Sequence, residues 1–221
     1  MSTPNSSRAR VAKFALLCLL SATALTQLTA CFPLIAAGAV GGTLAATDRR
    51  TLGTQLEDRQ IQLKAESNIA RTLSGENVNV TTYNRKVLLT GEVPTPEAKQ
   101  RAEQMAGGVE NVSAVVNELE IAGASSMQSR LSDTTITGKV KAAFVDDAQI
   151  MANAFKVTTE RGAVFLMGRV TQAEGERAAQ TASKVGGVTR VVKVLDYITD
   201  EELARLRNQP APSTPAATPA R

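Results

Sequence analysis

The sequence predicts an α+β fold of two tandem αββαβ units, each a small three-stranded mixed sheet with two helices on one face. The prediction depends on an internal repeat and on the same order of apolar patterns in both copies. Residues 80–93 match residues 157–170 without a gap, at a spacing of 77 residues (157 − 80). A Gly-Gly-Val triplet at residues 107–109 recurs at residues 186–188, a spacing of 79 (186 − 107). We therefore expect the intervening segment to be two residues longer in the second copy.

Each copy is expected to begin with a helix, because apolar residues recur three or four positions apart and share one helical face. This face comprises Ile61, Ala65, Ile69 and Leu73 in the first copy, and Ile136, Val140, Ala143 and Phe144 in the second. Two β-branched runs follow in each copy. Residues 84–86 or 160–162 separate these runs, a spacing short enough for a hairpin.

A second helix and a last strand complete each copy. The inward positions of the helix are Ala98, Ala102, Met105 and Ala106, or Ala178, Ala182 and Val185. We expect Gly108 and Gly187 to end it in the left-handed conformation, and Gly91 and Gly168 to be backbone positions of the second strand. The last strand is expected over residues 114–121 or 191–198. Because a helix joins the second strand to the third, the sheet is not purely antiparallel. A unit this small buries only about 60% of the surface that its unfolded chain exposes, and it is marginally stable alone. We therefore expect the two copies to pack together.

The first 30 residues have the three parts of a lipoprotein signal peptide. Basic residues precede an apolar stretch at residues 14–25, which is too short for a comfortable permanent membrane span. Residues 28–31, Leu-Thr-Ala-Cys, have the pattern of a lipobox. Cys31 is therefore the expected site of lipid attachment and the first residue of the mature chain. The other cysteine, Cys18, lies in the removed segment, so no thiol is left for a disulfide.

These patterns divide the chain into seven predicted parts. They are a signal peptide (1–30), a lipidated N-terminus with a flexible tether (31–53), the first copy (54–121), a linker (122–129), the second copy (130–198), a short helix (199–207) and a disordered Pro/Ala-rich tail (208–221).

Composition argues against two broad classes of function. Three of the 25 basic residues and none of the 21 acidic residues precede Cys31, so the mature chain has a net charge of +1 (22 − 21) and lacks the basic footprint of a nucleic-acid-binding protein. The chain has no histidine, so a Ser or Cys nucleophile with a His base is excluded. No glycine-rich phosphate loop is present, and Asp146-Asp147 is interpreted as solvated or capping acids. We expect no enzyme activity, small-molecule substrate, cofactor or metal.

The second copy, with KVTTERGAVFLMGRV at residues 156–170 and ASKVGGVTRV at residues 182–191, resembles the BON domain. The first copy matches less fully, because Arg85-Lys86 stands where the second has Arg161-Gly162. The resemblance covers residues 31–198. It implies a non-enzymatic protein that binds phospholipid surfaces and supports outer-membrane integrity, with enrichment at the division site.

The second copy is the expected partner of an anionic phospholipid membrane. Residues 133–198 carry nine basic and seven acidic residues, whereas residues 58–121 carry seven and nine, so the net charges are +2 and −2. The face of the first helix that points away from the core comprises Thr134, Thr135, Gly138, Lys139, Lys141, Ala142 and Val145. A mildly apolar stripe between lysines suits a headgroup layer. From the residues alone, it also fits an ordinary solvated helix face. Relatives in the family carry a tryptophan where Thr135 stands.

A second hypothesis assigns the two copies a role as a lipid-tethered periplasmic adaptor that docks an envelope protein. Both hypotheses place the chain at the periplasmic face of the outer membrane. Phe32, rather than aspartate, follows Cys31, which argues against retention in the inner membrane. Flotation of the non-lipidated protein with anionic vesicles distinguishes the two hypotheses.

Overall fold

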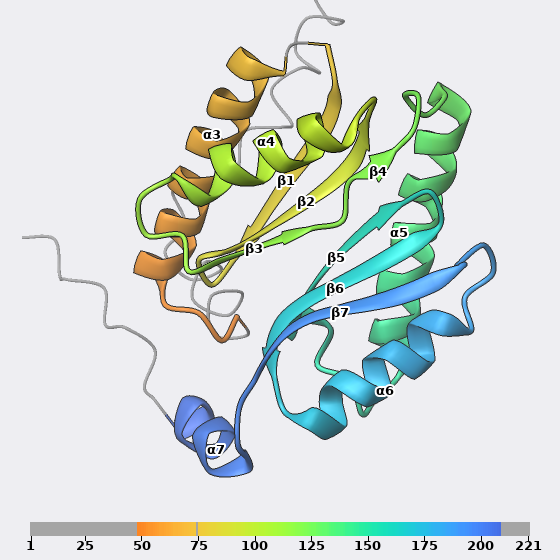
Figure 1. Cartoon of the computed structure of the whole chain (residues 1–221). Helices are drawn as coiled ribbons and strands as arrows, with labels where there is room; N and C mark the ends of the chain where they lie inside the picture. Colours follow the sequence, from red (N-terminus) through yellow and green to blue (C-terminus); the bar gives the residue numbers. More distant parts are fainter. Residues whose placement is uncertain (1–47, 74, 209–221) are drawn as a thin grey trace, which may run out of the picture. The chain divides into compact units, whose positions relative to one another are not determined.

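A computed structural model describes residues 48–73 and 75–208, and its elements occur in the predicted order twice (Figure 1). The first copy contains α3 (Leu52–Thr72), β1 (Asn77–Tyr83), β2 (Lys86–Val93), α4 (Pro96–Gly107), β3 (Ala114–Asn117) and β4 (Glu120–Ile121). The second contains α5 (Met127–Asp146), the 3-10 helix η2 (Ala152–Ala154), β5 (Phe155–Glu160), β6 (Ala163–Val170), α6 (Gln172–Ser183) and β7 (Arg190–Tyr197), and α7 (Asp200–Asn208) follows. The predicted α+β fold is confirmed.

Each copy has a mixed sheet. The hairpin strands β1 and β2 are antiparallel, while β3 pairs in parallel with β2, and β5, β6 and β7 repeat this arrangement. The crossover between the parallel strands is α4 or α6. In each copy both helices lie on the same side of the sheet, as expected (Figure 1).

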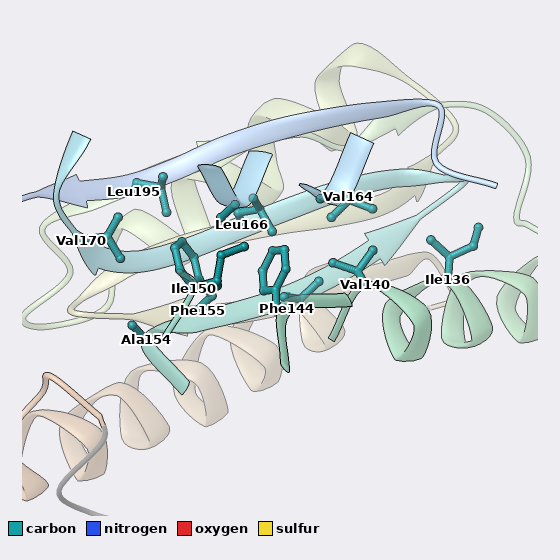
Figure 2. Close-up of a cluster of buried hydrophobic side chains, with 13 residues drawn as sticks. Ile136, Val140, Phe144, Ile150, Ala154, Phe155, Val164, Leu166, Val170 and Leu195 are labelled. Carbon is teal, nitrogen blue, oxygen red and sulfur yellow. The ribbon is translucent and has the colours of Figure 1, made fainter. Parts of the chain in front are cut away.

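A separate apolar core lies between each sheet and its helices. Successive strand residues point to opposite faces, so Val164 and Leu166 of β6 face the helices while Phe165 between them does not. Figure 2 shows Ile136, Val140 and Phe144 of α5 directed toward this sheet face. In the first copy the matching residues of α3 are Ile61, Ala65 and Ile69. Leu73 and Ala143, which we placed on the same faces, are only partly buried.

The sheet faces that the helices leave open form a third cluster shared by both copies. It comprises Tyr83, Leu88, Ala163, Phe165, Met167 and Val194. Beside it, Lys86 Nζ lies 2.6 Å from an Asp196 carboxylate oxygen. The expected packing of the two copies is therefore built from apolar strand residues with ion pairs at the margin.

The hairpin turns are held by a buried aspartate from the leading helix. Asp58 accepts hydrogen bonds from the backbone N–H groups of Asn84 and Arg85, both at 2.7 Å, and these two residues have φ of 49° and 63°. Positive φ at both central positions marks a type I′ turn. The first copy thus makes the hairpin without a turn glycine. In the second copy Asp133 binds the N–H groups of the Arg161-Gly162 turn at 2.9 and 2.8 Å.

The expected left-handed ends of the second helices are wrong. Gly108 caps α4 with φ of −75°, and α6 ends at Ser183 with Lys184 as its cap at φ of −85°. Gly187 does have a positive φ of 99°, but it lies in the loop beyond the helix. Its counterpart in the first copy is Asn111, at φ of 67°.

The spacing of 79 between the glycine pairs is therefore coincidental. The N-caps of the second helices, Thr95 and Thr171, are 76 residues apart (171 − 95), and so are Asn111 and Gly187 (187 − 111). Relative to the hairpin spacing of 77, the second copy is one residue shorter here, not two residues longer.

Three predicted boundaries also change. The strand expected over residues 114–121 is divided into β3 and β4, because Leu119 between them turns into the core. The tether predicted for residues 31–53 ends earlier, since Arg49 forms a bidentate ion pair with Glu174 and α3 begins at Leu52. The linker predicted for residues 122–129 is also shorter. Ser126 caps α5, which begins at Met127.

Two strand glycines lie against backbone. A Cβ atom at Gly91 would lie 1.9 Å from the carbonyl oxygen of Asn77, and Gly91 has φ of 110°. At Gly168 a Cβ atom would lie 2.5 Å from the carbonyl oxygen of Ala154. Any larger residue would therefore displace the neighbouring strand or η2.

The loop after α6 generates a stability prediction. Gly187→Val places a β-branched residue at positive φ, with its Cβ 3.0 Å from side-chain carbons of Ile136, so we expect a loss of about 1–3 kcal/mol in the free energy of unfolding. Thermal melts should show a clearly lowered midpoint. The matched control is Gly186→Val, because nothing lies within 4 Å of a Cβ there. Equal midpoints for the two variants would refute this role for Gly187.

Candidate functional site

The candidate site is the exposed face of α5, whose rotation is fixed from the opposite side. Ile136, Val140 and Phe144 pack against the sheet (Figure 2), and Asp133 binds the hairpin turn. These contacts leave the helix no freedom to turn about its axis. The residues on the opposite side of α5 are therefore exposed at the surface.

All seven residues proposed for the site are exposed: Thr134, Thr135, Gly138, Lys139, Lys141, Ala142 and Val145. Val145 is the largest apolar side chain among them, at 72% exposure. Apart from Gly138, its two chain neighbours and the adjacent backbone of α5, no described atom lies within 4 Å of a Cβ placed on Gly138, so no other element covers the middle of the face. That these residues bind a ligand remains a proposal.

The structure adds two residues that sequence reasoning missed. Met127 and Leu131 are 73% and 62% exposed. They precede Gly138 by eleven and seven positions, and so lie on the same helical face. The signal was present in this spacing, but the predicted linker had removed Met127 from the helix. We call the row Met127, Leu131, Thr135, Gly138, Ala142 and Val145 the α5 stripe.

The two threonines are less polar than their type suggests. The Thr134 hydroxyl donates to the carbonyl oxygen of Arg130, and the Thr135 hydroxyl donates to that of Leu131, both at 2.9 Å. Each hydroxyl proton is thus used within the helix. The surface between Leu131 and Gly138 consequently needs little water to satisfy its donors.

Basic side chains border the α5 stripe. Arg130, Lys139 and Lys141 are exposed, and none of them forms an ion pair with another residue in the described part of the chain. Three acids lie on or next to α5: Asp133, which is buried and binds the hairpin turn, Asp146, which is exposed, and Asp147, which binds Arg177 at 2.8 Å. Hydrogen bonds from Arg177 and from the backbone N–H of Gln149 hold the pKa of Asp147 below its ordinary value. Asp147 is thus engaged with α6, Arg130 lies within electrostatic reach of the partly buried Glu160, and Lys139 and Lys141 remain available.

Two other kinds of feature are absent from residues 48–73 and 75–208. No group of three or more histidine, cysteine, aspartate or glutamate residues is placed there to hold a metal ion. No helix in these ranges is both long and apolar enough to cross a bilayer. Cys31, the expected site of lipid attachment, lies outside the described residues.

Comparison with known proteins now places the fold in a family. The model of the BON domain matches the chain twice, at residues 57–123 and 132–199. The chain belongs to the BON domain family. The resemblance inferred from the repeat is confirmed, and the two matches correspond to the two copies.

Named relatives agree with this assignment. The chain is 38% identical to the outer membrane lipoprotein DolP of Haemophilus influenzae, over 81% of this chain and 94% of that protein. It is 34% identical to a 21 kDa hemolysin of Actinobacillus pleuropneumoniae, over 68% and 79%. It is 30% identical to osmotically-inducible protein Y of Escherichia coli, over 63% and 72%. None of these three BON relatives is named for an enzyme activity.

Proposed function

We propose that this BON protein is a non-enzymatic outer-membrane lipoprotein that binds anionic phospholipid surfaces through α5. The observation that carries the proposal is the α5 stripe, a mostly apolar row that runs from Met127 to Val145 and is bordered by Arg130, Lys139 and Lys141. The likeness to DolP supports the outer-membrane location, with Cys31 as the lipid anchor. A role in envelope integrity, including at the division site, follows from the family resemblance.

The physical basis is a combination of charge and shallow apolar contact. A basic side chain near an anionic bilayer contributes about 1 kcal/mol, and the effect falls off within a Debye length of about 8–10 Å. The stripe adds apolar contact through Leu131 and Val145 but has no tryptophan or tyrosine, the residues that favour the interface. We therefore expect weak, salt-sensitive binding, which becomes effective because the lipid anchor keeps the helix at the membrane.

Charge reversal on the flanks tests the site. Lys139→Glu with Lys141→Glu removes two attractive charges and adds two repulsive ones, while leaving the buried face of α5 intact. At about 1 kcal/mol per charge, binding to phosphatidylglycerol vesicles should fall more than tenfold, and 0.5 M salt should weaken the unchanged protein in the same direction. The measurement is vesicle flotation of residues 32–221, which keep every described residue.

The matched control for this variant is Lys184→Glu with Lys193→Glu, the same change of charge at exposed positions of the second copy outside α5. It should bind more tightly than the α5 variant. Thr135→Trp should strengthen binding by supplying an interfacial aromatic. Equal flotation of the unchanged protein and both charge variants would eliminate α5 as the site. Absence of flotation by every form would favour the adaptor that docks an envelope protein.

The anchor has a separate test. Cys31→Ala should leave the full-length protein without lipid and release it into the periplasm, because acyl chains at about 0.8 kcal/mol per buried CH₂ exceed what one helix face offers. Fractionation of cell envelopes measures the outcome. If the variant remained wholly with the outer membrane, the lipid would not be the main anchor.

A further inference from the structure

The first copy exposes an apolar row of its own on α3. Leu52, Leu56 and Leu63 are 53%, 67% and 49% exposed. They lie four and seven residues apart, so they share one face of the helix, opposite the buried Ile61, Ala65 and Ile69. We call them the α3 stripe. Three exposed leucines make it more apolar than the corresponding part of α5.

The α3 and α5 stripes occupy equivalent positions. Asp58 and Asp133 hold the hairpin turns of their own copies and are 75 residues apart (133 − 58). The buried faces correspond at the same spacing, since Ile61 matches Ile136. Leu52 and Leu56 therefore correspond to Met127 and Leu131, all four of which are exposed. The fold thus presents the same helical face twice.

The charge around the α3 stripe is basic, although the first copy as a whole is acidic. Arg59, Lys64 and Arg71 are exposed, and in the described ranges none of them pairs with a carboxylate. The two carboxylates nearest to them in α3 are already engaged: Glu57 binds Arg85 at 2.7 Å, and Glu66 accepts a hydrogen bond from Gln62 at 2.8 Å.

Two further acids of the first copy are shielded from solvent. Asp58 and Glu92 are buried. Burial alone would raise the pKa of Glu92, but hydrogen bonds from Asn77 and Ser125 outweigh it and lower the pKa. Within α3 itself, the three exposed cations face no acid that lacks a partner.

A shallow hollow of about 370 Å³ adjoins the row, and Leu63, Lys64, Ser67 and Arg71 line it together with Glu110. A hollow with two cations at its border offers a place for a phosphate-bearing headgroup, although Glu110 limits how much negative charge it accepts.

We propose that α3 is a second phospholipid-binding face, which inserts Leu52, Leu56 and Leu63 among the headgroups of an anionic bilayer. This inference rests on the proposed membrane-binding function and extends it to the first copy. The binding partner is a membrane because the leucines are bordered by cations, the pattern that complements an anionic surface. The lipid anchor also favours a membrane as the partner. Sixteen residues, 32–47, separate Cys31 from Asp48, so a lipid at Cys31 keeps Asp48, four residues before α3, within about 60 Å of the bilayer.

The test is flotation of residues 32–221 with vesicles of equal parts phosphatidylglycerol and phosphatidylcholine. Leu56→Ser with Leu63→Ser should lower binding about fivefold or more, because two partly inserted leucines are lost. The matched control is Ile121→Ser with Tyr197→Ser, which removes two exposed apolar side chains outside both stripes and should leave binding unchanged. Arg59→Glu with Lys64→Glu is a second variant that leaves the leucines in place, and it should also weaken binding. Melting curves check that each variant is folded.

The outcomes separate this inference from the proposed function. Loss of binding by both α3 variants, with the control unaffected, supports the second face. If the α5 charge variant loses binding while both α3 variants float like the unchanged protein, the second face is overturned and the proposed function stands. If the unchanged protein does not float, both fail.

Discussion

In each copy one buried aspartate of the leading helix accepts two backbone hydrogen bonds from the hairpin turn, and the arrangement of the copy depends on this contact. Asp58 and Asp133 join a helix to a turn 26 to 29 residues further along the chain. Since a carboxylate can accept from two adjacent N–H groups, it stabilises turn residues that have positive φ. Arg85 takes this conformation without being glycine. The same contact sets which face of the helix meets the sheet, and therefore which face meets the surroundings.

The second constraint is that each sheet is covered on both sides. Helices cover one face, and the other face contributes to the cluster of Leu88, Phe165 and Met167 that the copies share. The apolar surface of each sheet is therefore buried, under the helices on one face and in the shared cluster on the other. What remains exposed and apolar lies largely on the leading helices, where Leu56, Leu131 and Val145 are more than half exposed. Exposed apolar rows bordered by cations are typical of surfaces that meet a membrane.

The sequence was sufficient for the order of elements and for the rotation of α5, because Ile136, Val140 and Phe144 have helical spacing and fix the opposite face. The sequence was insufficient where the same residue type fits two different structural roles. Asp133 was not singled out, because an acid on a helix normally faces water and only the folded turn reveals its partners. The repeated Gly-Gly pair suggested equivalent caps, but the backbone equivalent of Gly187 is Asn111, which also tolerates positive φ. Met127 was missed because the serines before α5 suggested a linker rather than an N-cap.

The most direct test of membrane contact by α5 is a fluorescence scan along the helix. Residues 32–221 contain no cysteine, so Leu131→Cys, Gly138→Cys and Ala142→Cys can each carry one environment-sensitive dye without background. Ser132→Cys and Lys184→Cys are exposed positions off the α5 stripe. On addition of phosphatidylglycerol vesicles, we expect a blue shift at the three stripe positions and little change at the other two. A uniform response at all five positions, or none on the stripe, would contradict membrane contact by α5.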